Sequence, residues 1–402
     1  MKYDFISVPD RHGNDALAVD GVGEPNGFTP GKPKDGFSLI PMWVADMNFK
    51  VFPGIVDSVV KRASHPSFGY FETRDEYYSA IIKWQRERHG LDVERKNIGY
   101  ENGVLGCLAT ALRVFTAEND AVLLHSPCYI GFIGTVERAK RKAVYSPLLK
   151  EDGVWRMDFS DMEKKIVENN IRFAVFCSPH NPTGRVWEKE EIESAMEIYK
   201  KHNVTVFADE IWSDIIMPGN KFIPTASVSD DAKMRTITAC APSKTFNLAG
   251  LIGSYHIIFN DDTAQKMREE SAKTHYNSIN VLSEHALIGA YTEEGAVWTD
   301  ELCEVLSENI DFAVDFINKN FKGIEVLKPQ GTYMLYLDLS EYLENSGKTL
   351  DEVLSMGWDI GVAYQDGRPF KNPNTIRMNL ALPTRLVKEA FERLSLPFLK
   401  ER

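Results

Sequence analysis

Three segments of the sequence place a polar or reactive side chain within five positions of the end of a run of apolar residues. These side chains are Lys244, Asn181 and Asp209, and the runs before them are 234–241, 171–176 and 204–208. Short apolar runs of this kind predict buried strands of a parallel sheet. The three residues are 28 and 35 positions apart, which leaves room for a crossover helix between successive strands. We therefore expect all three at one edge of the sheet, where open α/β sheets bind ligands.

The three side chains have complementary chemistry. Loss of solvation at the end of a buried strand disfavours the ammonium form of Lys244, and its free amine can then attack a carbonyl carbon. A carboxylate such as Asp209 can hold a protonated ring nitrogen, and an amide such as Asn181 can donate to a phenolic oxygen. An amine, a carboxylate and an amide on one sheet edge suit pyridoxal 5′-phosphate.

Each residue also has an ordinary structural interpretation. A lysine is most often a solvated surface charge. An aspartate after a strand can cap the N-terminus of a helix. The sequence Asn181-Pro-Thr-Gly favours a turn in any protein, and such a turn could also aim the side chain. The occurrence of all three motifs together favours a cofactor site over these alternatives.

Taken together, Asn181-Pro-Thr-Gly184, Asp209 and Ser243-Lys244 resemble the motifs of the fold-type I, aspartate-aminotransferase-like enzymes that use pyridoxal phosphate. Within that family, the segments 41–47 (Pro-Met-Trp-Val-Ala-Asp-Met) and 241–251 are similar to the MalY/PatB group of cystathionine β-lyases. The resemblance extends from about residue 40 to Pro383.

The resemblance implies an α/β fold with a large domain and a small one. The large domain would hold a mostly parallel sheet sandwiched by helices, and a smaller α+β domain would be formed by both chain termini. We expect an N-terminal arm and part of the small domain in residues 1–52, the cofactor-binding domain in 53–290, and the small C-terminal domain in 291–402.

Sequence patterns predict several individual elements. The capping-box pattern of Ser160 and Glu163 predicts a helix that runs to about residue 170. An acidic start and a basic end predict a helix over 188–202. A long helix is expected over roughly 292–318, and strands over 333–339 and 375–380, in the C-terminal part.

Several residues have roles that follow from the resemblance or from their surroundings. Lys244 would hold the cofactor covalently and then act as base and acid at the substrate Cα. Tyr129 would stack on the pyridine ring, although a bare aromatic is more often core packing. Arg377 would grip the substrate carboxylate, with a structural salt bridge as its alternative. By the resemblance, Trp43 and Ala45 would line the substrate side.

The phosphate group of the cofactor needs donors without bulk. Gly103, Val104 and Leu105 begin a helical stretch whose free N–H groups could bind the dianion. Ser243 would add a hydroxyl. The resemblance implies that Tyr70 contacts the phosphate of the other subunit of a homodimer, with a buried interface aromatic as the alternative.

Three positions depart from the family pattern. Trp212 stands where many relatives have Tyr, so it should lie beside the cofactor without a hydrogen bond to the phenolic oxygen. Ile252 stands where aminotransferases often have Arg or Lys, so other donors must meet the phosphate charge. Asn48 replaces an aspartate of the subgroup, which leaves no carboxylate at that position.

The net charge and the cysteine content of the sequence limit the kinds of binding partner and compartment that we expect. The net charge of −12 argues against nucleic acid and anionic membranes. Five cysteines without a C-x-x-C pair suit a reducing compartment, and we expect a cytoplasmic protein. The expected ligands are a small amino-acid substrate and the cofactor, with no metal ion.

These features predict a carbon–sulfur β-lyase that acts on cystathionine, cysteine or related thioethers and releases a thiol, pyruvate and ammonia. An aminotransferase would use the same residues and is the nearest alternative. A second alternative is a regulator that keeps the cofactor and binds a transcriptional regulator, as members of the group are known to do. Lys244→Ala should then leave the partner interaction intact.

Overall fold

The computed structural model describes residues 1–24, 28–275 and 277–399. A seven-stranded sheet forms its centre in the strand order β2-β10-β9-β8-β7-β3-β4, and β10 runs antiparallel to its two neighbours. The strands are β2 (Ile98–Asn102), β3 (Ala121–Ser126), β4 (Lys142–Pro147), β7 (Phe173–Cys177), β8 (Thr205–Asp209), β9 (Thr236–Cys240) and β10 (Gly253–Ile257). The predicted apolar runs therefore form the adjacent parallel strands β7, β8 and β9.

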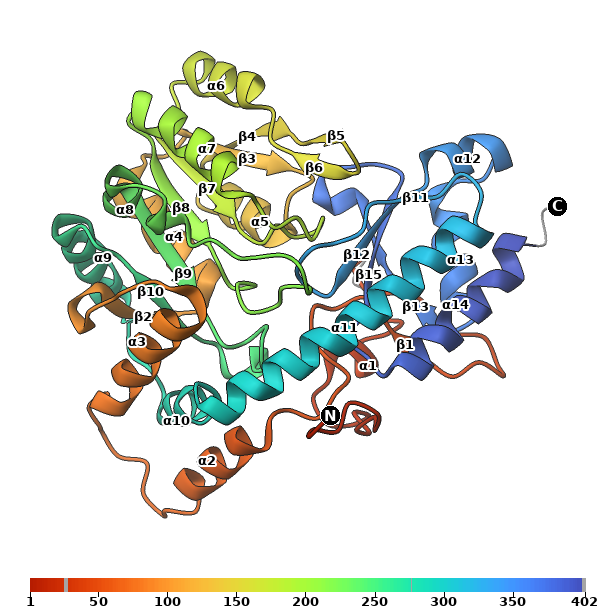
Figure 1. The fold of residues 1–402 in the computed structure, drawn as a ribbon, viewed down its shortest axis with the longest axis horizontal. Coiled ribbons are helices and arrows are strands. Elements are labelled where there is room, and N and C mark those ends of the chain that lie inside the picture. The colour runs from red at the N-terminus through yellow and green to blue at the C-terminus, as the bar shows by residue number, and fades with distance from the viewer. Residues whose placement is uncertain (25–27, 276, 400–402) are drawn as a thin grey trace.

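Helices cover both faces of this sheet (Figure 1). Alternate residues of β7 point to opposite faces, so Val175 lies in one buried cluster and Phe176 in the other. The first cluster includes residues of α4 (Val104–Phe115), α5 (Ile130–Arg138) and α9 (Asp261–Thr274). The second includes residues of α6 (Phe159–Glu168), α7 (Lys189–Lys201) and α8 (Asp230–Arg235). Burial on both faces explains why the strands are continuously apolar.

The start of α6 differs from the prediction. The cap residue is Asp158, whose side chain accepts a hydrogen bond from the Asp161 N–H, and Ser160 lies inside the helix. The earlier start brings Phe159 against the hydrophobic cluster on that face of the sheet. The helix over 188–202 is present as α7, which is capped by Glu188.

The C-terminal part of the chain forms a second, antiparallel sheet in the order β11-β12-β15-β14. Its strands are β11 (Glu325–Val326), β12 (Met334–Asp338), β14 (Gln365–Asp366) and β15 (Thr375–Asn379), and its helices are α12 (Ser340–Ser346), α13 (Leu350–Asp359) and α14 (Thr384–Leu399). The N-terminal strand β1 (Ile40–Pro41) pairs in parallel with β13 (Val362–Ala363). Both ends of the chain therefore meet here, while the boundaries 1–52, 53–290 and 291–402 stay a prediction.

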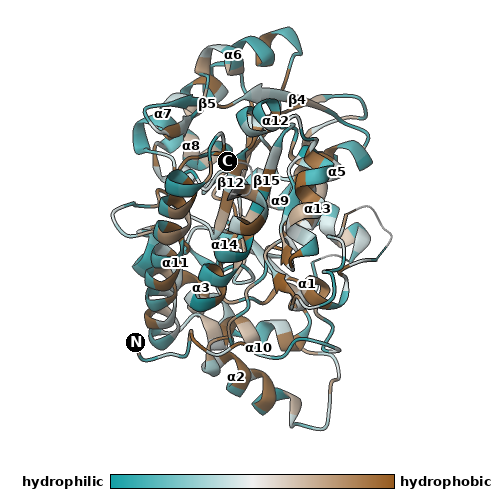
Figure 2. Ribbon diagram, turned by 90° about the vertical axis from the view of Figure 1, so that its right-hand side faces the viewer, coloured by the Kyte–Doolittle hydropathy of each residue, from teal (hydrophilic) through white to brown (hydrophobic). Residues whose placement is uncertain are grey.

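The helix α11 (Glu293–Asn320) runs for 28 residues alongside both sheets (Figure 1). It is capped by Thr292, close to the predicted start, and carries hydrophobic and hydrophilic residues on different sides (Figure 2). Its apolar side joins a continuous core that extends from Trp84 of α3 (Asp75–His89) to Leu354 of α13. The remaining elements are α1 (Leu17–Asp20), α2 (Pro53–Ala63), α10 (Val281–Ala290), the hairpin β5 (Leu149–Glu151) and β6 (Val154–Arg156), and the 3₁₀ turns 95–97, 225–227, 249–251 and 368–370. In the described ranges, no helix is both long enough and apolar enough to cross a membrane.

Candidate active site

A cavity of about 270 Å³ lies at the C-terminal edge of β7, β8 and β9. Ten of the predicted site residues line it: Ala45, Gly103, Val104, Leu105, Tyr129, Asn181, Asp209, Trp212, Ser243 and Lys244. The edge of the sheet thus gathers segments that are up to 199 residues apart in the chain, as the hydrogen bond from Lys244 to Ala45 shows.

Lys244 extends from the turn after β9 into this cavity. Its Nζ donates to the main-chain oxygen of Ala45 at 3.0 Å and lies 5.7 Å from the centre of the Trp212 ring. Burial, and then the charge of Arg377, lowers the pKa of Lys244 to about 8. An amine with that pKa has a substantial neutral fraction near neutral pH, which a nucleophile or a general base requires.

Asp209 ends β8, lines the same cavity and is 4% exposed. Its Oδ1 accepts a hydrogen bond of 3.0 Å from the Ile211 N–H. The residues that follow form turns, so the helix-capping alternative for Asp209 does not apply. Burial raises the pKa of Asp209 to about 7, against the opposing effects of the Ile211 N–H and Lys244. A buried carboxylate without a charged partner is costly, so a cationic group in the cavity would stabilise it.

Part of the cavity lining carries main-chain and side-chain donors that suit an anion. The cap residue of α4 is Gly103, with φ 80° and ψ 151°, a conformation that is essentially confined to glycine. The first bond within the helix runs from the Cys107 N–H to the Gly103 oxygen at 3.0 Å. Val104 and Leu105, whose N–H groups precede that bond, line the cavity, as does Ser243. These neutral donors suit a phosphate dianion.

Arg377 lies on β15 next to the cavity and is 3% exposed. Its two terminal nitrogens donate to neutral oxygens: Asn181 Oδ1 at 2.9 Å, Gln365 Oε1 at 2.5 Å and the Trp43 oxygen at 3.3 Å. Among the described residues, its Nε has no hydrogen-bond partner. Burial lowers the pKa of Arg377 to about 10. A buried guanidinium with only neutral partners retains charge for an anionic ligand. These neutral contacts stand in place of the structural salt bridge that was the alternative interpretation of Arg377.

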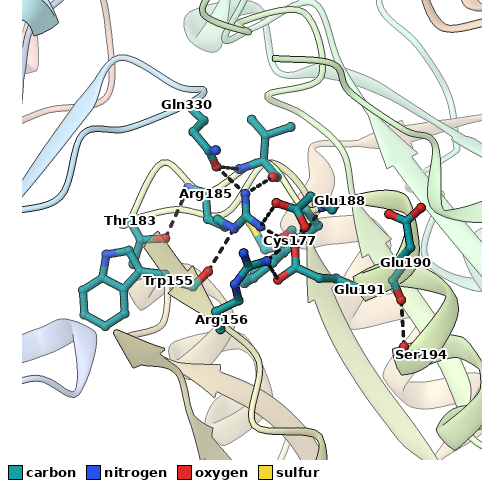
Figure 3. Close-up of polar contacts among 12 residues, drawn as sticks. Trp155, Arg156, Cys177, Thr183, Arg185, Glu188, Glu190, Glu191, Ser194 and Gln330 are labelled. Carbon is teal, nitrogen blue, oxygen red and sulfur yellow. Dashed lines mark hydrogen bonds and ion pairs between the residues drawn. The ribbon is translucent and has the colours of Figure 1, made fainter. Parts of the chain in front are cut away.

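The loop that carries Asn181 is fixed by the buried Arg185 (Figure 3). The guanidinium of Arg185 donates to the Trp155 oxygen at 2.9 Å and to Gln330 Oε1 at 2.5 Å, and it is ion-paired with Glu191. Gln330 precedes β12 of the second sheet. The contact therefore joins the Asn181 loop to the C-terminal part of the chain.

The aromatic side chains around the cavity are closely packed. A Cβ atom on Gly131 would lie 2.4 Å from the Tyr129 ring, so a larger residue at that position would clash with the ring. Trp212 packs edge-on against Tyr333, with ring centres 4.7 Å apart. The hydroxyl of Tyr333 donates to the Ala45 oxygen at 3.0 Å, the same oxygen that accepts from Lys244.

Three predicted residues lie outside the cavity lining: Arg377, described above, and Trp43 and Tyr70. The indole of Trp43 is buried with Val22 and Ala363, and its Nε1 donates to the Ala18 oxygen at 3.0 Å. Its main-chain oxygen is the part that faces the site, through Arg377. Tyr70 lies fully exposed in the segment 64–74, so within one subunit it does not reach the cavity.

The positions that depart from the family pattern also have defined surroundings. Ile252 lines the cavity and has φ 59°, an unusual backbone conformation for a β-branched residue. Asn48 is buried, and its Oδ1 accepts from Arg11 at 3.0 Å. Arg11 also pairs with Asp46 at 2.5 Å. Asp46 therefore supplies the carboxylate of this segment.

Sequence reasoning missed Tyr333, Arg185 and the Ile211 N–H. The first two act across more than 140 residues of chain, to Ala45 and to Gln330, so no local pattern could pair them. The third could have been found, because an aspartate that follows a strand commonly bonds to the N–H two residues later.

The chain belongs to the aminotransferase class I and II family, whose model matches residues 44–394. It is 33% identical to cystathionine β-lyase PatB of Bacillus subtilis (strain 168) over 366 residues, which are 90% of this chain and 92% of PatB. It is 29% identical to protein MalY of Escherichia coli (strain K12), with 95% of each chain covered.

A solved structure resembles the whole chain. Cystalysin from Treponema denticola, whose crystal contains pyridoxal 5′-phosphate, matches with a TM-score of 0.92 and 30% identity, and 100% of each chain is covered. The predicted fold class, a mostly parallel sheet between helices with a smaller α+β part, is therefore confirmed, and so is the resemblance to the MalY/PatB group.

Proposed function

We propose that the chain is a pyridoxal 5′-phosphate-dependent carbon–sulfur β-lyase. Its substrate would be cystathionine, cysteine or another S-substituted cysteine, and its products a thiol, pyruvate and ammonia. The observation that carries the proposal is the cavity shared by Lys244, whose pKa is lowered to about 8, and the buried carboxylate of Asp209. The name of the relative PatB supports a β-lyase, and cystalysin contains the same cofactor.

The residues fit the cofactor group by group. Lys244 would form the covalent bond to its aldehyde carbon, and Asp209 would face its ring nitrogen. The helix-start N–H groups after Gly103 and the Ser243 hydroxyl would bind its phosphate. Tyr129 would lie against its ring. When bound, the cofactor supplies an electron sink that stabilises negative charge at the substrate Cα.

The chain's own groups would carry the proton and the substrate. Arg377 would bind the substrate carboxylate through its forked nitrogens, which orients the Cα–H bond. Lys244, displaced by the substrate amine, would remove the Cα proton, because a pKa of about 8 leaves about half of its amine neutral at that pH. Ala45 and Tyr333 fix the position of that amine through a common carbonyl oxygen. The Cβ–S bond would then break with departure of the thiolate.

An aminotransferase is the second candidate, since the similar proteins include an aspartate aminotransferase as well as a cystathionine β-lyase. It would need the same proton transfer by Lys244, followed by return of the proton to a different carbon. Product analysis separates the two. The purified protein with cofactor should release thiol and pyruvate from cystathionine without any added 2-oxo acid. A strict requirement for a 2-oxo acid, with no thiol released, would replace the lyase by an aminotransferase.

We further propose that the protein is a homodimer in which Tyr70 completes the cavity of the neighbouring subunit. Exposed apolar side chains gather on α2 and on the segment after it: Val56, Val60, Phe68, Tyr70 and Phe71. Figure 2 shows α2 at the lower edge of the molecule, with hydrophobic residues beside hydrophilic ones. Exposed apolar residues gathered in this way are typical of an interaction surface.

A further inference from the structure

A buried carboxylate outside the cavity, Asp214, lies in the loop that follows β8. Its side chain is 4% exposed and is surrounded by donors. It accepts from Trp84 Nε1 at 3.1 Å and from Thr245 Oγ1 at 2.9 Å. Arg88 Nε lies 3.3 Å and His89 Nε2 3.1 Å from the same carboxylate. The proposed reaction uses none of these contacts.

Asp214 reaches the turn of Lys244 by two routes. The first is the hydrogen bond to Thr245, the residue directly after Lys244. The second passes through Trp84, whose ring centre lies 5.8 Å from that of Phe246, the next residue of the turn. Both Thr245 and Phe246 are completely buried, so water does not compete for either contact.

Asp214 also belongs to the loop that begins at Asp209. The two residues are five positions apart, and the peptides between them form consecutive turns. One carboxylate therefore connects the segment that carries Asp209 to the segment that carries Lys244. The turn of Lys244 is also held by its own main-chain hydrogen bonds, from the Phe246 N–H to the Pro242 oxygen at 2.9 Å and from the Leu248 N–H to the Ser243 oxygen at 3.0 Å.

We propose that Asp214 is a positioning residue, which acts through Thr245 to hold the amine of Lys244 at its working distance from Asp209. The inference rests on the proposed function, since it gives Lys244 and Asp209 their roles. A buried carboxylate suits this task because a charged acceptor makes stronger and more directional hydrogen bonds than a neutral one. The guanidinium of Arg88, whose Nε lies 3.3 Å from the carboxylate, compensates for its burial.

Thr245→Val tests the proposal with the least disturbance, because it removes the hydroxyl and keeps the branched shape. With cofactor bound, we expect kcat to fall by about ten-fold or more and KM to change much less, as loss of a hydrogen bond to a charged group implies. The pH at which the visible band of the lysine-bound cofactor titrates should also shift. Thr245→Ser retains the hydroxyl and should behave as the wild-type protein in both measurements.

Thr236→Val is a matched control. Thr236 is also buried, and its hydroxyl donates to the Ala232 oxygen at 2.7 Å, but it lies at the end of β9 remote from the cavity. This variant should keep the wild-type kcat and titration. Equal effects of Thr245→Val and Thr236→Val would show general loosening of the fold and would overturn the proposal.

Asp214→Asn, alone and combined with Thr245→Val, tests whether Asp214 and Thr245 act as a pair. If Asp214 acts through Thr245, the effects on the titration should be less than additive, because both changes remove the same bond. Fully additive effects would overturn the coupling. If Asp214→Asn does not fold, the Thr245 variants decide alone.

The spectral titration separates this proposal from the proposed function. A shifted band in Thr245→Val, with no thiol release even from the wild-type protein, would support positioning and reject the lyase. Thiol release by the wild type together with an unchanged band and kcat in Thr245→Val would support the lyase and reject positioning.

Discussion

Arg377 donates a hydrogen bond of 2.9 Å from its guanidinium to the side-chain oxygen of Asn181, across 196 residues of chain. The proposed carboxylate anchor and one proposed cofactor contact thus form a single unit. The amide nitrogen of Asn181 stays available for the cofactor when its oxygen is engaged in this way.

Arg377→Lys tests whether the forked geometry of the guanidinium is needed in addition to its positive charge. Lysine keeps the positive charge but cannot reproduce the forked contacts to Asn181, Gln365 and a carboxylate. We expect kcat/KM for thiol release to fall by about 10–100-fold, mainly through KM. Arg393→Lys, in α14 and bonded to Ser38, is the control and should leave kcat/KM unchanged. Equal kinetics of Arg377→Lys and the wild type would remove Arg377 from the substrate site.

Gly103→Ala should weaken cofactor binding through the backbone. A Cβ at this position would meet only Ile252, at 3.7 Å, so the cost comes from φ 80° and ψ 151° and is about 1–3 kcal/mol. Relief of that strain would turn the helix-start N–H groups away from the phosphate. Gly90→Ala is the control, because Gly90 also has positive φ but ends α3 in open space. Titration of the apo-protein with cofactor should show a raised Kd for Gly103→Ala alone.

Much of the cavity could be predicted because its residues sit at the ends of strands. Asn181, Asp209 and Lys244 each follow a buried strand, and a parallel sheet brings such ends together. The glycine that starts α4 was likewise recognisable from its place before an apolar helix.

Contacts between remote segments could not be predicted. The indole of Trp43 points to Ala18 rather than to the cavity, because it packs with Val22 and Ala363, and nothing local indicates those neighbours. The start of α6 was predicted at Ser160, but Asp158, which is also a favourable cap residue, caps the helix. Phe159 then packs against the hydrophobic cluster on that face of the sheet, a contact between remote segments. The assignment of roles to the site residues stays a prediction until variants are measured.

Asp209 should make the stability of the apo-protein depend on pH. Its pKa is raised from 3.8 to about 7 by burial, so between these values the folded state binds more protons than the unfolded state. The contribution of Asp209 to stability therefore falls as pH rises from about 4 to about 7, by roughly 2–4 kcal/mol. Urea unfolding at several pH values should show that the free energy of unfolding of Asp209→Asn rises relative to that of the wild type as the pH increases from about 4 to about 7. A constant difference would mean that the carboxylate is not desolvated.

Mixed dimers test the proposed role of Tyr70. Tyr70→Ala and Lys244→Ala should each be nearly inactive as homodimers. A hybrid of the two would contain one site with both native residues, provided that Tyr70 reaches across the interface. Mixing equal amounts under exchange conditions should restore about a quarter of the wild-type thiol release, since half of the dimers would be hybrids with one intact site. No recovery, with subunit exchange verified, would contradict the shared site.

The most direct test compares the wild type with Lys244→Ala in the visible absorption spectrum after addition of pyridoxal 5′-phosphate, with thiol release from cystathionine measured on the same samples. The wild type should show the band of a lysine-bound cofactor and release thiol. Lys244→Ala should lack the band and lose at least about 10²–10⁴-fold in rate, since the proton transfer depends on that amine. A Lys244→Ala protein that keeps both the band and the rate would contradict the account.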